Sequence, residues 1–297
     1  MVEVPVVVFR PRTWAAAMAV YLPRRALSTS SSSCVVYDLV SCGLTEYDTV
    51  WRYQKALCEH LHEQRRAVTG AGHAVAASAH PDVILLVQHK SVYTLGRGAD
   101  AGNVKLTQAQ IASDPLGTRV VRIERGGEVT WHGPGQVVAY PIFDLHRNKR
   151  DLHWWVRSLE DVVIQSIGRM GVQGERSPVN SGVWVGEDKL SAIGISATRW
   201  ITYHGIALNV SCDMRYFDKI VPCGIAAHGV CKLDSLAPPA PGEDETERLD
   251  RVCSELIRSF GDVFGVQVAQ RLRTAVQLDE LLDSYPSIKN AKAGIAR

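Results

Sequence analysis

The chain has 297 residues, 46% of them hydrophobic, and a formal net charge of +2 at pH 7. This charge is too small to indicate non-specific nucleic-acid binding without a concentrated basic patch. The seven cysteines include no Cys-x-x-Cys pair, and His60 and His62 lie two apart on an expected helix and so point to different faces. These spacings argue against a metal site and against a disulfide scaffold.

The first 34 residues have the composition of a targeting leader. They contain four arginines but a single acid, Glu3, and end in a serine-rich run, which is typical of a mitochondrial transit peptide. The apolar stretch 14–22 is too short to span a membrane. A secretory signal is the alternative, but its charges should precede the apolar stretch, whereas Arg24 and Arg25 follow it. We therefore expect residues 1–34 to direct the protein to the mitochondrial matrix.

Helical and strand patterns follow one another between residues 35 and 265. Apolar residues at helical spacing predict helices at 48–66, 152–170 and 249–264, with a proline- and acid-rich loop at 236–247. Short apolar runs predict strands at 83–87, 120–124, 137–140, 183–185 and 206–210. This arrangement predicts a single α+β domain with a mixed, largely antiparallel sheet flanked by helices, and a C-terminal extension of unknown role at 266–297.

Residues 125–136 read RGGEVTWHGPGQ and place four glycines around Arg125, Trp131 and His132. Glycine is used where φ must be positive or where the backbone must approach another group closely. A plain hairpin turn is the alternative interpretation. No Gly-Lys-Ser/Thr and no helix follow, so the segment is neither a P-loop nor a dinucleotide fingerprint. An apolar run at 136–143 predicts a strand with Pro141 at its edge or end, so we expect 125–136 to form a loop between two strands.

Two positions further along the chain carry groups suited to acyl transfer. Lys189 opens the second strand of a hairpin expected at 186–195, and Cys223 lies between a proline and a glycine. Taken singly, Lys189 is ordinarily interpreted as a solvated lysine and Cys223 as a small buried hydrophobic residue. Together, a thiol in a turn and a lysine that can hold its thiolate and move its proton indicate nucleophilic catalysis.

Five segments in this order resemble motifs of the lipoyl(octanoyl) transferase family, and the resemblance runs from about residue 35 to about residue 265. It implies the fold of the biotin and lipoate protein ligases, with 35–265 as the catalytic domain. Trp131 stands where the family usually has an aromatic residue, often tyrosine. The matching segments are 89–97, 125–136, 189–194, 204–210 and 222–224.

The resemblance implies transfer of octanoyl from octanoyl-acyl carrier protein to a lysine of a lipoyl domain, without ATP, metal or other cofactor. The implied acceptors are the lipoyl domains of the glycine-cleavage H protein and of the 2-oxoacid dehydrogenases. Cys223 would become acylated, and Lys189 would act as acid and base. The positions implied to contact the acyl substrate are Arg125, Gly126, Gly127, Glu128, Val129, Thr130, Trp131, His132, Ala192, Ile193, Gly194, Gly205, Ile206 and Ala207.

The octanoyl chain needs an apolar slot with small residues along it. Burial of six methylenes at ~0.8 kcal/mol each favours a medium chain over acetyl by on the order of 5 kcal/mol. We expect His132 and His204 to close the polar end of the slot near the reacting carbonyl, although a core imidazole is the alternative for each. The small residues expected along the slot are Gly126, Gly127, Ala192, Gly194 and Gly205.

Two other functions stay open. An ATP-dependent lipoate or biotin ligase on the same fold would not need Cys223, and a catalytically silent protein that binds acyl chains or lipoyl domains would need neither Cys223 nor Lys189. The basic run 147–150 is either a docking patch for an acidic acyl carrier protein or a solvated loop.

Overall fold

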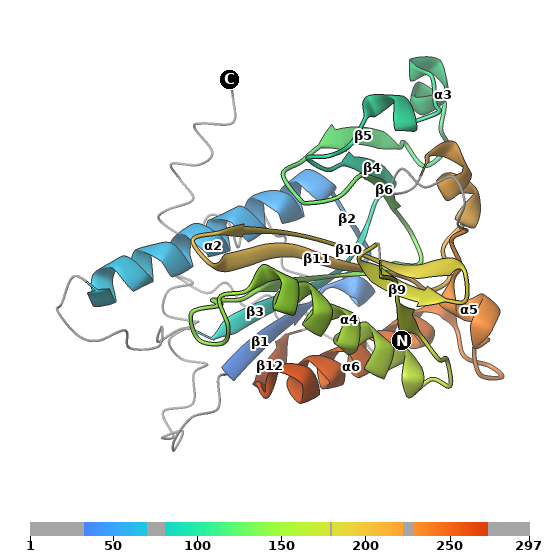
Figure 1. Cartoon of the computed structure of the whole chain (residues 1–297). Helices are drawn as coiled ribbons and strands as arrows, with labels where there is room; N and C mark the ends of the chain where they lie inside the picture. Colours follow the sequence, from blue (N-terminus) through green and yellow to red (C-terminus); the bar gives the residue numbers. More distant parts are fainter. Residues whose placement is uncertain (1–32, 70–80, 179, 222–228, 273–297) are drawn as a thin grey trace, which may run out of the picture.

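The computed structural model describes residues 33–69, 81–178, 180–221 and 229–272. Residues 1–32 of the expected leader 1–34, the expected nucleophile Cys223 and residues 273–297 of the expected extension 266–297 lie outside these residues. The inner ends of both segments, at 33–34 and 267–272, belong instead to strands of the central sheet. A nine-stranded sheet forms the centre of the molecule, helices cover both of its faces, and a three-stranded sheet lies beside it (Figure 1). The predicted α+β architecture is confirmed. In the described ranges, no helix is both long enough and apolar enough to cross a bilayer.

The central sheet is mixed. Its strands are β1 (Ser33–Asp38), β2 (Leu44–Thr45), β3 (Asp82–His89), β7 (Gln136–Ile142), β8 (Glu175–Arg176), β9 (Gly182–Val185), β10 (Asp188–Thr198), β11 (Ile201–Asn209) and β12 (Gln267–Leu272). Their order is β12-β1-β3-β7-β11-β10-β9-β8, and β2 pairs with β3. The β12-β1-β3 and β2-β3 pairings are parallel, and every pairing from β3 to β8 along this order is antiparallel. Pro141 lies near the end of β7, but β7 is a central strand and not an edge strand.

The smaller sheet contains β4 (Val92–Leu95), β5 (Arg119–Arg122) and β6 (Val129–His132), in the order β5-β4-β6. The expectation of one continuous loop at 125–136 is therefore wrong, because β6 occupies its centre. The four residues of β6 are β-branched, aromatic or histidine, and they pair with β4 in the register Tyr93↔Trp131. Glycine-containing turns at 125–128 and 133–135 flank this short strand.

Several of the helices begin or end at recognisable capping residues. They are α2 (Tyr47–Thr69), α3 (Gln108–Ala112), α4 (Leu152–Gly168), α5 (Leu233–Leu236) and α6 (Glu245–Phe264), with 3₁₀ turns η1 (Val40–Cys42), η2 (Ala101–Asn103) and η3 (Met214–Lys219). Asp151 caps α4 by accepting from the backbone N–H of Trp154. Asp244 and Glu247 form a capping box that starts α6 inside the expected 236–247 loop, and Gly265 ends the helix at φ 62°.

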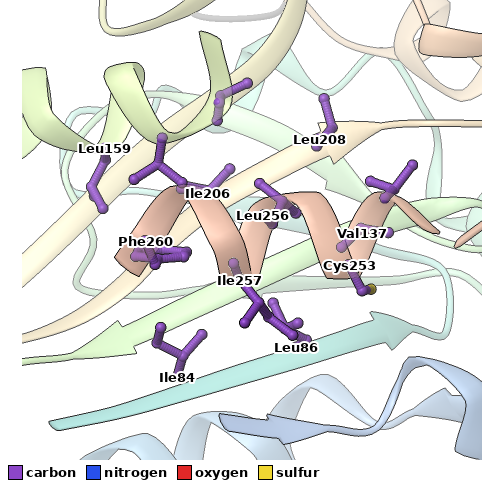
Figure 2. Close-up of a cluster of buried hydrophobic side chains, with 14 of the residues drawn as sticks. Ile84, Leu86, Val137, Leu159, Ile206, Leu208, Cys253, Leu256, Ile257 and Phe260 are labelled. Carbon is purple, nitrogen blue, oxygen red and sulfur yellow. The ribbon is translucent and has the colours of Figure 1, made fainter. Parts of the chain in front are cut away.

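A large hydrophobic cluster lies between the central sheet and the helices α4 and α6 (Figure 2). Leu256 and Phe260 of α6 pack in it with Ile84 and Leu86 of β3 and with Ile206 of β11, and all five are fully buried or nearly so. Side chains two residues apart on a strand share a face. Burial of each such side chain contributes about 1.5–3 kcal/mol, so this cluster anchors both helices to the sheet.

The opposite face of the sheet packs against α2. Tyr53 and Leu57 of α2 lie in a second cluster with Leu85, Val138 and Tyr140 from β3 and β7. Val138 and Tyr140 also line a cavity. The α2 side of the sheet therefore carries the candidate site.

Candidate active site

A cavity of about 120 Å³ lies on this face of the sheet. It brings together every substrate position expected from the sequence except Trp131, and it adds Lys189. Cys223 lies outside the described residues. The lining residues are Tyr47, Arg125, Gly126, Gly127, Glu128, Val129, Thr130, His132, Val138, Tyr140, Asn180, Ser181, Lys189, Ala192, Ile193, Gly194, His204, Gly205, Ile206 and Ala207.

The turn at 125–128 lies directly against β10. The backbone N–H of Gly126 donates to the carbonyl of Ile195 at 2.9 Å. A Cβ atom on Gly194 would lie 3.1 Å from the Gly126 carbonyl oxygen, and one on Gly96 would lie 2.2 Å from the Gly127 carbonyl oxygen. Glycine is needed here because three backbone segments approach one another more closely than side chains allow.

Arg125 holds this turn in place. Its guanidinium donates to the carbonyl and the hydroxyl of Thr94 at 2.8 and 2.9 Å and to the Gly126 carbonyl at 3.0 Å. Its side chain is almost fully buried. These contacts commit the guanidinium to the turn, so Arg125 shapes the cavity wall.

Lys189 reaches the cavity through an irregularity of β10. The register between β10 and β9 shifts between Lys189 and Ser191, whereas strict alternation would put Lys189 on the same face as Ile193 and opposite Ala192. Such bulges re-aim side chains next to active sites. The ammonium donates to the carbonyl of Ser181 at 3.3 Å and lies 4.8 Å from the ring centroid of Trp184. Only 7% of the residue is exposed.

The segment that follows Cys223 returns to Lys189. The N–H of Lys189 donates to the carbonyl of Gly229 at 3.0 Å, and the N–H of Cys231 donates to the carbonyl of Lys189 at 3.0 Å. Gly229 is six positions after Cys223 in the chain. The backbone of Lys189 is therefore bound to the segment that Cys223 precedes, as well as to β9.

His132 is held as a neutral imidazole with a defined tautomer. The Nε2 of Gln136 donates to the Trp131 carbonyl at 3.2 Å and to Oδ1 of Asn209 at 2.9 Å, so its Oε1 faces His132 Nδ1 at 2.7 Å. That oxygen can only accept, and Nδ1 therefore carries the proton. Burial, and then the nearby His89, lower the pKa of His132 to about 3. At neutral pH its Nε2 is a bare acceptor.

Behind the cavity, His89 supports Tyr140. Nδ1 of His89 lies 3.2 Å from Oγ1 of Thr45 and 3.4 Å from the Thr45 carbonyl, so Nδ1 is the donor. Nε2 of His89 therefore accepts from the Tyr140 hydroxyl at 2.7 Å. Burial lowers the pKa of His89 to about 4 and raises the pKa of Tyr140. This wall of the cavity is polar but uncharged.

His204 lies far from the ammonium of Lys189. It pairs with Ile195 across β10 and β11, while the Oγ of Ser181, beside that ammonium, donates to the Ile193 carbonyl on the other side of β10. Two strand spacings of ~4.8 Å and a two-residue offset of ~3.3 Å per residue separate the backbones of Ser181 and His204 by roughly 12 Å. This separation argues against the expectation that His204 closes the polar end beside the reacting carbonyl, and it places His204 in a part of the cavity away from the Lys189 ammonium.

Residues 46–260 match the family model of the lipoyl protein ligase A/B catalytic domain. The chain belongs to this family. It is 42% identical over 229 residues to an octanoyltransferase of Gloeobacter violaceus, with 77% of this chain and 90% of that protein covered. It is also 42% identical over 231 residues to an octanoyltransferase of Thermosynechococcus vestitus, with the same coverage of both chains.

Solved structures of lipoate ligases share the fold of this A/B-family domain. A lipoate-protein ligase A bound with ATP aligns with a TM-score of 0.63 at 12% identity, over 85% of this chain and 92% of that one. A putative lipoate protein ligase from T. acidophilum aligns with a TM-score of 0.61 at 13% identity, over 86% and 95%. At this identity the likeness concerns the fold alone, and it confirms the fold predicted from the sequence.

Trp131 is the expected substrate contact that lies elsewhere in this A/B-family domain. Its ring is fully buried in a separate cluster, stacks on Tyr216 at 4.8 Å, and donates from Nε1 to Oγ of Ser91 at 2.9 Å. Alternation along β6 explains this, because His132 and Thr130 take the cavity side and Trp131 takes the other.

Five lining residues were not expected from the sequence. Tyr140 could have been found, because its hydroxyl is a polar group within the apolar run that follows the glycine-rich motif. No signal marks the others. They are Tyr47, Val138, Asn180 and Ser181. Among the residues that the structure describes, no group of three or more His, Cys, Asp or Glu side chains could hold a metal ion.

Proposed function

We propose that this A/B-family domain is an octanoyltransferase that moves octanoyl from an acyl carrier protein thioester to a lysine of a lipoyl domain. Relatives at 42–45% identity that this chain covers over most of their length are octanoyltransferases. The observation that carries the chemistry is the nearly buried Lys189 at one end of a cavity lined by glycine and alanine. The specific carrier and the specific lipoyl domains are part of the proposal.

Two acyl exchanges make up the reaction. Cys223 gives its thiol proton to the Lys189 side chain in its neutral amine form, and the Cys223 sulfur forms a new bond to the thioester carbonyl carbon. The carbon–sulfur bond to the carrier breaks, and the carrier sulfur leaves with the proton from Lys189. One thioester replaces another, so no nucleotide is needed to drive this step. The lysine amine of the lipoyl domain then attacks the acyl-cysteine carbonyl, and Lys189 takes the amine proton. The carbon–sulfur bond to Cys223 breaks, and Lys189 gives the proton to the departing sulfur, which restores the thiol. The amide product is more stable than a thioester, which makes the second step irreversible.

Small residues on the cavity face provide room for the acyl chain. Ala192 and Ala207 oppose each other across β10 and β11, and Gly194 opposes Gly205 two residues further along. These four positions share one face of the sheet. Burial of the six methylenes there is worth on the order of 5 kcal/mol.

The ligase alternative is less supported. Lipoate ligases share the fold at 12–13% identity, while the relatives near 42% identity are octanoyltransferases. A ligase would activate a free acid with ATP and would not depend on Cys223.

Intact-protein mass spectrometry tests the proposal. The purified chain is incubated with octanoyl-acyl carrier protein in the absence of ATP, and we expect a gain of one octanoyl group that hydroxylamine removes. Cys223→Ser should abolish the gain. Cys231→Ser is the matched control, because Cys231 is half-buried and bound to the Lys189 backbone. Loss of the adduct in Cys231→Ser alone would reassign the nucleophile, and modification only with ATP would favour the ligase.

The carrier-docking role of the basic run 147–150 has less support than its sequence suggests. Arg147 donates to the fully buried Asp82, and only 7% of the Arg147 side chain is exposed. Lys149 pairs with Asp151 at 3.0 Å. Two of the three basic side chains therefore have internal partners.

We also propose mitochondrial targeting by residues 1–34, on the composition of that segment. Import assays of the full chain with isolated mitochondria and isolated chloroplasts test it. Chloroplasts are included because the relatives named above are cyanobacterial and both kinds of transit peptide are rich in serine and poor in acids. Protease-protected, shortened protein in mitochondria is expected, and uptake by chloroplasts alone would contradict the proposal.

A further inference from the structure

The side chain of His204 breaks the alternation of β11. Tyr203, Gly205 and Ala207 share the α2 face, so His204 should point to the α4 side. Instead its φ is 59°, in the left-handed region, and its ring lines the cavity on the α2 face. A non-glycine residue in this region costs of order 1–3 kcal/mol and is found mostly where the surroundings impose it.

The surroundings of His204 explain the unusual backbone. Continuing the β7–β11 register places Pro141 opposite His204, and proline has no N–H to offer its neighbour. Gly205 also admits the bend, since a Cβ there would lie 2.6 Å from Pro141 Cδ. Gln54 of α2 accepts the His204 N–H at 2.7 Å. The local geometry therefore fixes the imidazole toward the cavity.

The imidazole of His204 keeps its polar edge for the cavity. Neither ring nitrogen has a hydrogen-bond partner among the described residues, although the residue is only 2% exposed. Its ring lies 6.2 Å from that of Tyr140 in an edge-to-face arrangement. A buried polar group without a partner costs about 1–3 kcal/mol. Both this cost and the backbone strain are concentrated on one residue at the end of the cavity.

The distance from Lys189 to this end matches a medium acyl chain. The backbones of Ser181, beside the ammonium, and His204 are roughly 12 Å apart. C–C bonds of ~1.5 Å advance an extended chain by about 1.25 Å each, so the seven bonds of octanoyl span roughly 9 Å. The remaining few ångströms correspond to the contacts at the carbonyl and at the terminal methyl.

We propose that His204 is the specificity-determining end wall of the slot, which limits the transferred acyl chain to about eight carbons. This inference rests on the proposed octanoyltransferase function. A longer chain would have to press apolar methylenes against the polar edge of an imidazole that the backbone cannot move aside. A hydrocarbon wall at this position would instead offer apolar contact to the extra methylenes.

Competition between octanoyl and decanoyl carrier proteins tests the inference, with kcat/KM measured for the parent and for His204→Gly. Glycine accepts φ 59° without strain and opens the end of the slot. We expect the decanoyl-to-octanoyl ratio to rise by roughly 15-fold, since two further methylenes become buried at ~0.8 kcal/mol each. The matched control is Arg199→Gly, which relieves a positive φ of 47° in the adjoining turn and should leave the ratio unchanged.

A second variant shortens the slot in front of His204. Ala207→Leu adds bulk on the cavity face between Lys189 and His204, and it should shift the preference from octanoyl toward hexanoyl. If both His204→Gly and Ala207→Leu keep the parent ratios, the inference is overturned. If His204→Gly fails to fold, Ala207→Leu decides. If the parent forms no octanoyl-enzyme without ATP, the proposed function itself fails, and that result is separate from any change in ratio.

Discussion

Replacement of Lys189 by methionine separates a catalytic role from a structural one. Methionine keeps the unbranched stem that packs in the cavity wall but removes the ammonium. The lost hydrogen bond to the Ser181 carbonyl is worth about 1 kcal/mol, and the lost contact with the Trp184 ring adds about 0.5–2 kcal/mol. Relief of a nearly buried charge offsets part of this loss. We expect a net change of about 1 kcal/mol, or a Tm shift of a few degrees.

The effect on the reaction should be far larger. Loss of a positioned acid and base lowers the rate by about 10²–10⁴, so octanoyl transfer to a lipoyl domain should fall by that factor in Lys189→Met. Lys189→Arg keeps the charge but cannot release a proton, and it should be equally impaired. Lys232→Met is the matched control, because the Lys232 ammonium also donates to backbone carbonyls, those of Ser211 and Cys212, both at 3.3 Å.

Single-turnover transfer from octanoyl-acyl carrier protein, followed by mass spectrometry of the acceptor, measures this directly. Thermal melting of each variant supplies the stability. Transfer by Lys189→Met within tenfold of the parent would refute the acid–base assignment. A matching loss in Lys232→Met would show that the effect is structural.

Three other predictions concern stability. Burial holds the pKa of His89 at about 4 and the pKa values of His132 and His204 at about 3, so the unfolded chain binds more protons than the folded one below pH 6.5. Burial raises the pKa of Asp82 to about 7. The folded chain therefore takes up a proton there as the pH falls, which offsets the loss of stability caused by one of the three histidines. Urea unfolding should therefore show a loss of a few kcal/mol from pH 7 to pH 5, and equal or higher stability at pH 5 would contradict it. Gly205→Ala places a Cβ 2.4 Å from the Ala139 carbonyl oxygen and should cost about 1–3 kcal/mol by forcing β7 and β11 apart; an unchanged Tm would show that the strands adjust freely. Trp131→Phe keeps the stack on Tyr216 but loses the hydrogen bond to Ser91, so it should lose about 1–2 kcal/mol with little change in kcat/KM, and the reverse pattern would return Trp131 to the substrate site.

The helices were the most predictable part of the fold. Amphipathic spacing placed the expected 48–66 and 152–170 helices within three residues of α2 and α4, because their apolar stripes are long and face the core. The short strand β6 was missed because glycine-rich turns flank it on both sides. The small sheet to which it belongs depends on pairing between residues 38 positions apart, such as Tyr93 and Trp131, and local patterning cannot show such pairing.

The sequence predicted most of the residues that line the candidate site but not where each of them lies in the cavity. The resemblance to a family supplied the segments 125–136, 189–194 and 204–210, and residues from each of these three line one cavity. The sequence does not show that His204 and Lys189 lie at opposite ends, because their separation follows from the register of β9, β10 and β11. Tyr47 reaches the cavity from the start of α2, and no periodic pattern distinguishes it from a core tyrosine.

Both ends of the cavity are set by departures from strand alternation. The register shift after Lys189 brings the ammonium to the cavity face, and the left-handed backbone of His204 brings the imidazole to the same face. Each departure has its own support, with Gly229 and Cys231 bound to the Lys189 backbone and Gln54 bound to that of His204. Because the two supports come from different segments, the ends can change independently. A change at His204 should therefore alter which chain is accepted while the acid–base chemistry at Lys189 persists.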